Sequence, residues 1–263
     1  MRVAMCQIQV GDDPDENLRQ VREALALAGD VDLAVFPEAV HLRFGNDLAK
    51  VAEPLDGAFV GELRRAAREH GTALVAGVFE PADGDRVYNT AVAIDAAGDL
   101  VASYRKMHLF DAFGDRESDR VAAGDWPVVV DLAGVRLGLI TCYDVRFPEL
   151  ARALVERGAD VLVVIAAWGQ GVFKEEHWTT LVRARAIENT VWVVAVDKAP
   201  DRSRPLSGGP GGVGRSMLID PMGTVLADLG PFPSVRVGEI DTRVTEHVRG
   251  ILPALAHRRR DVL

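Results

Sequence analysis

The stretch that decides the fold is residues 134–150, GVRLGLITCYDVRFPEL, in which an apolar run is followed by a turn and a helix start. The run is rich in branched aliphatic residues and has the length of a strand. Pro148 is typical of the first position of a helix. A strand that leads into a helix is the repeating unit of α/β proteins, which build their sites at the carboxyl ends of the strands. We therefore expect Cys142, in the turn, to lie at the carboxyl edge of a sheet.

Strand and helix signals alternate on both sides of this stretch. In the first half, the expected strands are 3–10, 31–36, 72–80, 87–95, 100–105, 127–132 and 134–141, and the expected helices are 14–28 and 59–70. In the second half, the expected strands are 158–168, 191–197, 216–220, 224–229 and 235–241, and the expected helices are 148–157, 174–190 and a weak one at 243–249. Because hairpins and helical connections are mixed, the pattern predicts an α/β fold with mixed sheets and the helices outside.

The composition is that of one well-packed domain, residues 1–263, with 48% hydrophobic residues. A formal net charge of −9 and a pI near 5.2 disfavour nucleic acid as a partner, because phosphate binding requires clustered Lys and Arg. The basic cluster HRRR at 257–260 is expected to be a solvated tail. Cys6 and Cys142 are too few for a disulfide framework, which fits a reducing compartment.

Nothing in the chain predicts a membrane partner. The longest apolar run, residues 161–168, is far shorter than the roughly 20 residues that a membrane helix needs. The first apolar stretch ends at Gly11 and Asp12, so no secretory signal is expected and the sequence predicts a cytoplasmic protein. The glycine-rich loop at 207–212 has the composition of a phosphate cradle. No phosphate-binding pattern leads from it into a helix, so a mobile loop is favoured.

Three ionisable side chains come within two residues of the ends of predicted strands: Glu38, Lys106 and Cys142. Each alone would be interpreted as a solvated residue or, for the cysteine, as a packed one. Together they suit a single mechanism. A thiol nucleophile needs a base to take its proton and a cation to hold the oxyanion that its attack creates.

Three segments resemble the signature blocks of the nitrilase, or carbon-nitrogen hydrolase, superfamily. They are FPEA at 36–39, YRKMHLFD at 104–111 and TCYDVRFPEL at 141–150. The similarity continues in the same order through HW and RARAIEN within 177–189 and GRSMLIDPMG at 214–223. This resemblance implies a four-layer α-β-β-α sandwich of the nitrilase type, with no cofactor and no metal ion.

The resemblance also implies a catalytic triad of Glu38, Lys106 and Cys142, with Glu117 in the place of the family's second glutamate. The motif CYD at 142–144 is similar to the motif of the amidase branches, whereas in true nitrilases the cysteine is usually followed by Trp-Glu. We therefore expect a hydrolase of non-peptide carbon-nitrogen bonds. Its expected substrate is the amide of a small carboxylic acid, of the deaminated-glutathione or ω-amide type.

In the expected mechanism Glu38 accepts the thiol proton of Cys142, and the thiolate attacks the amide carbon. Lys106 and the backbone N–H of Tyr143 hold the oxyanion. Ammonia leaves, and water activated by a glutamate hydrolyses the thioester, with Glu117 positioning the substrate or the base.

Further residues are expected around the substrate. Aromatic side chains near these blocks are candidates for the pocket wall: Phe113, Tyr143 and Trp168. Arg146 either pairs with a substrate carboxylate or locks the turn through Asp144 or Glu149.

Other hypotheses stay open. A Cys-His hydrolase would use His108 or His177, although the first can orient the Lys106 loop and the second can be a buried helix residue. Within the same fold, hydrolysis of an N-carbamoyl amino acid or a nitrile is an alternative, and the segment IAAW at 165–168 departs from the pattern of many relatives. A non-catalytic binding protein is disfavoured, because all three triad positions are intact.

Assembly is the last expectation. The helices at 148–157 and 174–190 carry apolar faces, and the resemblance implies that they form a two-fold interface. We expect a homodimer or a higher homo-oligomer, with a small-molecule amide as the other partner. Charged residues on the second helix are expected to form ion pairs within or across the interface, with a solvated face as the alternative: Arg183, Arg185 and Glu188.

Overall fold

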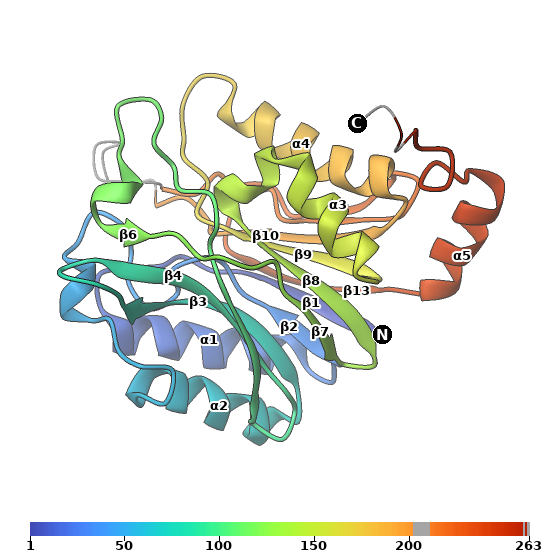
Figure 1. Ribbon diagram of the computed structural model, residues 1–263. Helices are drawn as coiled ribbons and strands as arrows, with labels where there is room; N and C mark the ends of the chain where they lie inside the picture. Colours follow the sequence, from blue (N-terminus) through green and yellow to red (C-terminus); the bar gives the residue numbers. More distant parts are fainter. Residues whose placement is uncertain (202–210, 260, 262–263) are drawn as a thin grey trace.

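The computed structural model describes residues 1–201, 211–259 and 261. These residues form two β-sheets stacked face to face, with a pair of helices on each outer side (Figure 1). This arrangement is the four-layer α-β-β-α sandwich that the sequence predicts.

The first sheet has the strand order β13-β1-β2-β3-β4-β5, and β6 pairs with β4. Its strands are β1 (Arg2–Gln7), β2 (Leu33–Val35), β3 (Ala73–Pro81), β4 (Val87–Ile94), β5 (Leu100–Arg105), β6 (Val121–Ala122) and β13 (Ser234–Glu239). β1, β2 and β3 are parallel, β4 is antiparallel to both of its neighbours β3 and β5, and β13 is antiparallel to β1. β2, β3 and β5 therefore end at the same edge of the sheet.

The second sheet has the strand order β12-β11-β10-β9-β8-β7. Its strands are β7 (Val129–Leu132), β8 (Val135–Thr141), β9 (Val161–Ala166), β10 (Trp192–Asp197), β11 (Met217–Ile219) and β12 (Val225–Asp228). The three central strands β8, β9 and β10 are parallel. Their carboxyl ends form the edge at which a site is expected in an open α/β sheet.

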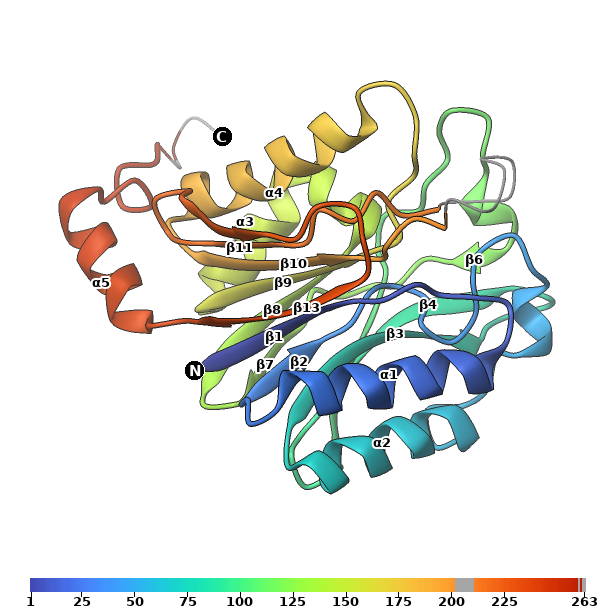
Figure 2. The same ribbon diagram turned by 180° about the vertical axis from the view of Figure 1, so that it is seen from behind.

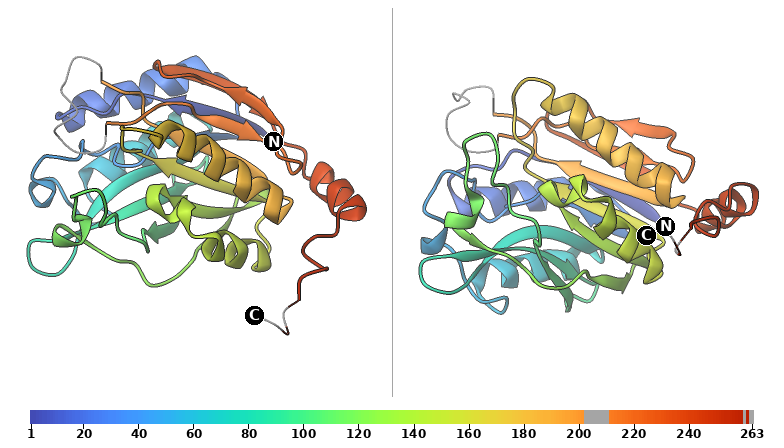
Figure 3. Two further views of the ribbon diagram at one scale, coloured as in Figure 1. Left: turned by 90° about the horizontal axis from the view of Figure 1, so that it is seen from above. Right: turned by 45° about the horizontal axis from the view of Figure 1, so that its top comes forward.

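Two helices cover each sheet. The helices are α1 (Pro14–Ala28), α2 (Ala58–His70), α3 (Pro148–Glu156), α4 (Lys174–Asn189) and α5 (Thr242–Ile251). Figure 2 shows α1 and α2 side by side on the outer face of the first sheet. α3 and α4 cover the second sheet, and α5 lies beyond the edge of both sheets (Figure 3). Short 3₁₀ helices are η1 (Leu48–Lys50), η2 (Glu117–Asp119) and η3 (Cys142–Arg146).

The central strands β1, β2 and β3 of the first sheet are buried on both faces. Successive side chains of each strand point to opposite faces of the sheet. In β2, Leu33 and Val35 pack in the core between the two sheets, whereas Ala34 packs under the helices. Cys6 of β1 also faces the helices and is fully buried there, and this burial raises the pKa of its thiol well above the usual range. Cys6 is therefore a packing residue.

Several expected segments differ from the structure. β2 and β9 are shorter than the strands expected at 31–36 and 158–168. β1 ends at Gln7 rather than at residue 10, because the chain leaves the sheet and the carbonyl of Ile8 accepts from the backbone N–H of Ala199 at 2.9 Å. α5 is a full helix, longer than the weak one expected. The basic tail is not solvated throughout, since Arg258 forms an ion pair with Glu156 of α3. Residues 207–210 of the glycine-rich loop and Arg260 lie outside the described residues.

In the described ranges, none of the helices combines the length and the apolar character needed to cross a membrane.

His41 is a buried titratable residue in the segment after β2. Its ring stacks on Phe59 of α2 with the centroids 4.2 Å apart, and its Nδ1 has no hydrogen-bond partner within residues 1–201, 211–259 and 261. Burial lowers the pKa of His41 to about 4, against a small opposing effect of Glu53. The unfolded chain thus binds a proton near pH 6.5 that the folded protein does not accept until about pH 4.

We predict that His41 makes the protein less stable as the pH falls from 7 to 5. The free energy of unfolding should drop by about 2 kcal/mol more in the wild type than in His41→Phe, because phenylalanine has no proton to gain. Denaturant unfolding at the two pH values measures this difference. His247→Phe, which removes an exposed histidine of α5, should keep the wild-type dependence. Parallel curves for the wild type and His41→Phe would contradict the prediction.

Candidate active site

A cavity of about 590 Å³ opens at the carboxyl ends of parallel strands from both sheets. Glu38 follows β2 and Lys106 follows β5 of the first sheet, whereas Cys142 follows β8 of the second. All eight site residues that the sequence predicts line this cavity: Glu38, Lys106, Phe113, Glu117, Cys142, Tyr143, Arg146 and Trp168. The structure therefore brings together residues that lie more than 100 positions apart in the chain.

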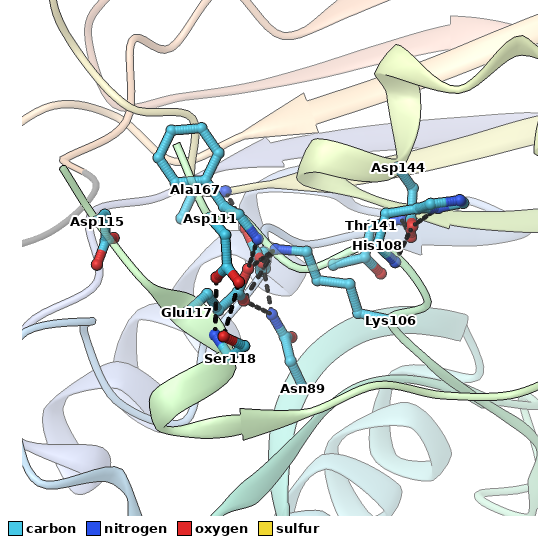
Figure 4. A network of polar contacts seen from close by, with 12 residues as sticks. Asn89, Lys106, His108, Asp111, Asp115, Glu117, Ser118, Thr141, Asp144 and Ala167 are labelled. Carbon is cyan, nitrogen blue, oxygen red and sulfur yellow. Dashed lines mark hydrogen bonds and ion pairs between the residues drawn. The ribbon is translucent and has the colours of Figure 1, made fainter. Parts of the chain in front are cut away.

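A buried ammonium group between two carboxylates is the centre of the site (Figure 4). Lys106 Nζ donates to both oxygens of Glu117, at 2.9 and 2.8 Å, and to Oε1 of Glu38 at 3.3 Å. The side chain of Lys106 is 2% exposed and that of Glu38 is 1% exposed. Burial alone would lower the pKa of Lys106, but Glu117 and Glu38 outweigh it and raise the pKa well above the usual range. Lys106 is therefore charged.

Each carboxylate is fixed by further donors. Glu38 accepts from the side-chain amide of Asn89 at 2.6 Å and from the backbone N–H of Ala167 at 2.7 Å. Glu117 accepts from the backbone N–H of Phe110 at 2.6 Å. Because Ala167 follows β9 of the second sheet, the bond to Glu38 joins the two sheets directly at the site.

The backbone of Glu38 passes very close to β3. Gly77 lies on that strand, and a Cβ atom at this position would be 2.4 Å from the backbone nitrogen of Ala39 and 2.7 Å from Cα of Glu38. The backbone N–H of Gly77 donates to the carbonyl of Pro37 at 3.1 Å. The absence of a side chain at Gly77 thus allows the approach that places Glu38 in the cavity.

Cys142 begins η3 in a left-handed backbone conformation, with φ of +50°. Such a conformation is costly for a residue other than glycine, and it is maintained by the surrounding contacts. Burial is the main cause that raises the pKa of the Cys142 thiol well above the usual range. Glu38 raises it further, and Lys106 opposes the change. The resting thiol is therefore protonated and needs a base to become a nucleophile.

The carboxylate of Asp144 clamps this turn. It accepts from the hydroxyl of Tyr104 at 2.6 Å, from the backbone N–H of His108 at 2.9 Å and from the backbone N–H of Thr141 at 3.1 Å. Figure 4 shows Asp144 close to His108 and Thr141. The clamp ties the Cys142 turn to the segment that carries Lys106.

Arg185 braces the same turn from α4. Its Nε donates to the carbonyl of Val145 at 2.8 Å, and its guanidinium pairs with Glu188. Arg183 donates to the carbonyl of Gly223. These contacts lie within one chain. The solvated face that was the alternative for Arg185 is wrong, because this side chain is buried.

Cations and aromatic rings form another part of the lining. The guanidinium of Arg146 lies 4.9 Å from the ring centroid of Trp168, and its Nη2 is 3.3 Å from Nδ1 of His177. In the described part of the chain Arg146 pairs with neither Asp144 nor Glu149. Lys174 Nζ lies 3.6 Å from the ring centroid of Phe113, and burial, with repulsion from Arg146, lowers its pKa. Arg146 therefore lines the cavity without an ion pair to Asp144 or Glu149.

The two histidines of the Cys-His hypothesis have other contacts. Nδ1 of His108 lies 2.7 Å from Asp144, and its ring stacks on Phe147 with the centroids 3.7 Å apart. His177 contacts Arg146. Neither histidine is among the described residues that line the cavity.

Buried polar residues that were not predicted as part of the site include Asn89, Tyr104 and Asp197. Asn89 interrupts the apolar strand β4, and that polar residue at a strand centre was the available signal. Asp197 accepts from the backbone N–H groups of Trp168, Val213 and Gly214, at 2.6 to 3.0 Å. Within the described ranges, no group of three or more His, Cys, Asp or Glu residues is arranged to hold a metal ion.

A sequence profile described as carbon-nitrogen hydrolase matches residues 2–249. The chain belongs to the carbon-nitrogen hydrolase family. A Mycobacterium tuberculosis protein named as a hydrolase is 43% identical over 250 residues, which cover 92% of this chain and 89% of that protein. The deaminated glutathione amidase of Escherichia coli O157:H7 is 38% identical over 240 residues, covering 90% of this chain and 88% of the relative.

A solved structure is also similar to this carbon-nitrogen hydrolase. It is a mutant of the amidase from Nesterenkonia sp. AN1, with the acetamide moiety of fluoroacetamide bound covalently to the active-site cysteine. The two chains are 28% identical with a TM-score of 0.84, and the match covers 100% of this chain and 95% of that one.

We predict that Gly77→Ala impairs this carbon-nitrogen hydrolase by displacing Glu38. The new methyl group meets backbone atoms that have little freedom to move, so turnover of a simple amide should fall about 100-fold, as expected for a misplacement near 1 Å. Gly61→Ala in α2 is the matched control, because a Cβ there has no neighbour within 4 Å and alanine suits a helix. Normal turnover by a folded Gly77→Ala protein would show that this contact does not set the position of Glu38.

Proposed function

We propose that the protein is a cofactor-independent thiol amidase that hydrolyses the primary amide of a small carboxylic acid and releases ammonia. One observation carries the proposal. The buried ammonium of Lys106, held by Glu38 and Glu117, lines the same cavity as Cys142. A nucleophile, a carboxylate base and a fixed cation are the groups that acyl transfer needs. The names of the amidases reported above agree with an amide as the reactant.

In the first half of the reaction, the sulfur of Cys142 forms a bond to the amide carbon while its proton passes to Glu38. The carbonyl oxygen becomes an oxyanion, which Lys106 Nζ and the backbone N–H of Tyr143 stabilise. Collapse of this intermediate breaks the carbon-nitrogen bond. The proton on Glu38 goes to the leaving nitrogen, so ammonia departs and a thioester remains.

In the second half, a water molecule attacks the thioester and gives a proton to Glu38. The same two donors stabilise the second oxyanion. Its collapse breaks the carbon-sulfur bond, and the proton returns from Glu38 to the sulfur as the carboxylic acid leaves. Glu117 holds Lys106 in place throughout through its two short hydrogen bonds.

Glu38 is better placed than either histidine to act as the base. The thiol of Cys142 is protonated at rest, so its proton must be taken as the new bond forms. Glu38 interacts electrostatically with Cys142 and lines the cavity, whereas His108 is held by Asp144 outside the described lining. Glu38 is therefore the base in the proposed mechanism.

Arg146 supplies the contact for a carboxylate on the substrate. Its guanidinium is exposed to the cavity and stacked on Trp168, and a planar fork of N–H groups suits a carboxylate. A substrate of the ω-amide type carries a primary amide and such a carboxylate. A substrate of the deaminated-glutathione type carries such a carboxylate and a substituted amide, so the leaving group would be an amine in place of ammonia. Phe113 and Tyr143 line the same cavity beside it.

We predict that Cys142→Ala and Cys142→Ser lose turnover without loss of fold, because each removes the sulfur but little volume. Ammonia release should be measured over small amides, N-carbamoyl compounds and nitriles, with Cys6→Ala as the active control. In the wild type, iodoacetamide should label Cys142, which lines the cavity, before the fully buried Cys6. Turnover by Cys142→Ala would exclude the covalent mechanism, and a preference for nitriles or N-carbamoyl compounds would replace the amide as substrate.

We further predict that Lys106→Arg lowers kcat/KM at least 100-fold. A guanidinium spreads its charge over a plane and does not fit the compact position between two carboxylates, so the oxyanion loses its donor. His108→Ala should lose much less, because His108 only supports the turn. An inactive His108→Ala beside a nearly normal Lys106→Arg would return the assignment to a Cys-His hydrolase.

A further inference from the structure

Lys198 is a buried cation of the cavity lining that the mechanism does not use. It directly follows β10 and is only 2% exposed. Its Nζ has no hydrogen-bond partner in the part of the chain that the structure describes. The transfer of an ammonium group from water to the interior costs several kcal/mol of free energy when no partner replaces the water. The buried position of Lys198 therefore needs an explanation.

The carboxylates near Lys198 are engaged elsewhere. Asp197 accepts from three backbone N–H groups. Glu38 is held by Lys106, Asn89 and the backbone of Ala167. Asp12 pairs with Arg43, whose own charge repels Lys198.

The net effect at Lys198 is destabilisation of its charge. Burial is the main cause that lowers the pKa of Lys198 to about 8, and Arg43 lowers it as well, against the opposing attraction of Asp197, Glu38 and Asp12. An anion that enters the cavity would stabilise the charged form of Lys198.

The backbone fixes Lys198 in this position. Its N–H donates to the carbonyl of Ala166 at 3.1 Å, and its own carbonyl accepts from the N–H of Gly214 at 3.1 Å. Gly212 packs directly against it, since a Cβ there would lie 2.2 Å from the carbonyl oxygen of Lys198. Its partners come from the end of β9 and from residues 212–214, so the residue belongs to the rigid part of the site.

Lys198 and Arg146 belong to different parts of the lining. Arg146 comes from η3 and neighbours Lys174, the first residue of α4. Lys198 neighbours Arg43, which comes from the segment between β2 and η1. Lys198 and Arg146 therefore belong to different segments of the chain, and each has a different cation as its neighbour.

We propose that Lys198 binds a second carboxylate of the substrate, separate from the one assigned to Arg146, and so selects amides that carry two carboxylates besides the amide group. The proposal rests on the proposed amidase function and specifies its substrate class. A carboxylate suits the position better than a phosphate, because a single ammonium offers one compact charge, whereas a phosphate dianion is usually held by several donors.

The test compares glutaramoyl-aspartate, an amide with two carboxylates, with its β-methyl ester, which keeps one. At pH 6.5, where Lys198 is charged, the wild type should have a kcat/KM for the diacid at least tenfold above that for the ester. In Lys198→Met this ratio should fall to near one. Lys50→Met is the control, because it removes an exposed lysine of η1 outside the cavity, and it should keep the wild-type ratio. If Lys198→Met does not fold, Lys198→Gln removes the charge and keeps a polar side chain of similar length.

A binding measurement separates this proposal from the amidase function. Calorimetry on Cys142→Ala, with and without Lys198→Met, should give at least tenfold tighter binding of the diacid than of the ester only when Lys198 is present. If the wild type hydrolyses no amide but this difference in binding is found, the amidase function fails and the second carboxylate site stands. Two results would overturn the second carboxylate site. One is equal affinity for the diacid and the ester with Lys198 present, and the other is an unchanged kcat/KM ratio in the Lys198 variants.

Discussion

The burial of one ammonium group between two carboxylates is the constraint on which the rest of the site depends. Lys106 is held in the interior by contacts with both Glu38 and Glu117, and the loss of Lys106 would leave two buried carboxylates without a cation between them. Each carboxylate is in turn fixed by a backbone N–H group, that of Ala167 or that of Phe110. The charges therefore fix the positions of several loops as well as supplying the chemistry.

The two stacked sheets divide the proposed catalytic groups between them. Glu38 and Lys106 extend from strands of the first sheet, whereas Cys142 extends from a strand of the second. Parallel strands on both sides end at one edge, so short loops are enough to bring these side chains together. The hydrogen bond from the backbone of Ala167 to Glu38 is a direct polar link across the boundary. The four-layer architecture is thus what makes the constellation possible.

The sequence predicted the structural features that depend on neighbouring residues, but not those that depend on contacts with residues far along the chain. Apolar runs locate the strand ends, so the positions of Glu38, Lys106 and Cys142 could be inferred. The end of β1 could not, because Ile8 leaves the sheet to pair with Ala199, far along the chain. Helical spacing likewise gave no indication that Arg185 turns inward to the carbonyl of Val145. A polar residue in an apolar strand marks Asn89, but its partner Glu38 could not be inferred, because only the fold brings the two together.

The position of the site at the boundary between the sheets makes catalysis sensitive to a motion that spectroscopy of the backbone would not register. A slide of one sheet over the other by about 1 Å would leave the hydrogen bonds within each sheet intact, yet it would separate Cys142 from Glu38 and Lys106. Heat or denaturant would then inactivate the enzyme while its circular dichroism is still native. Its turnover therefore reports on how tightly the two sheets pack against each other.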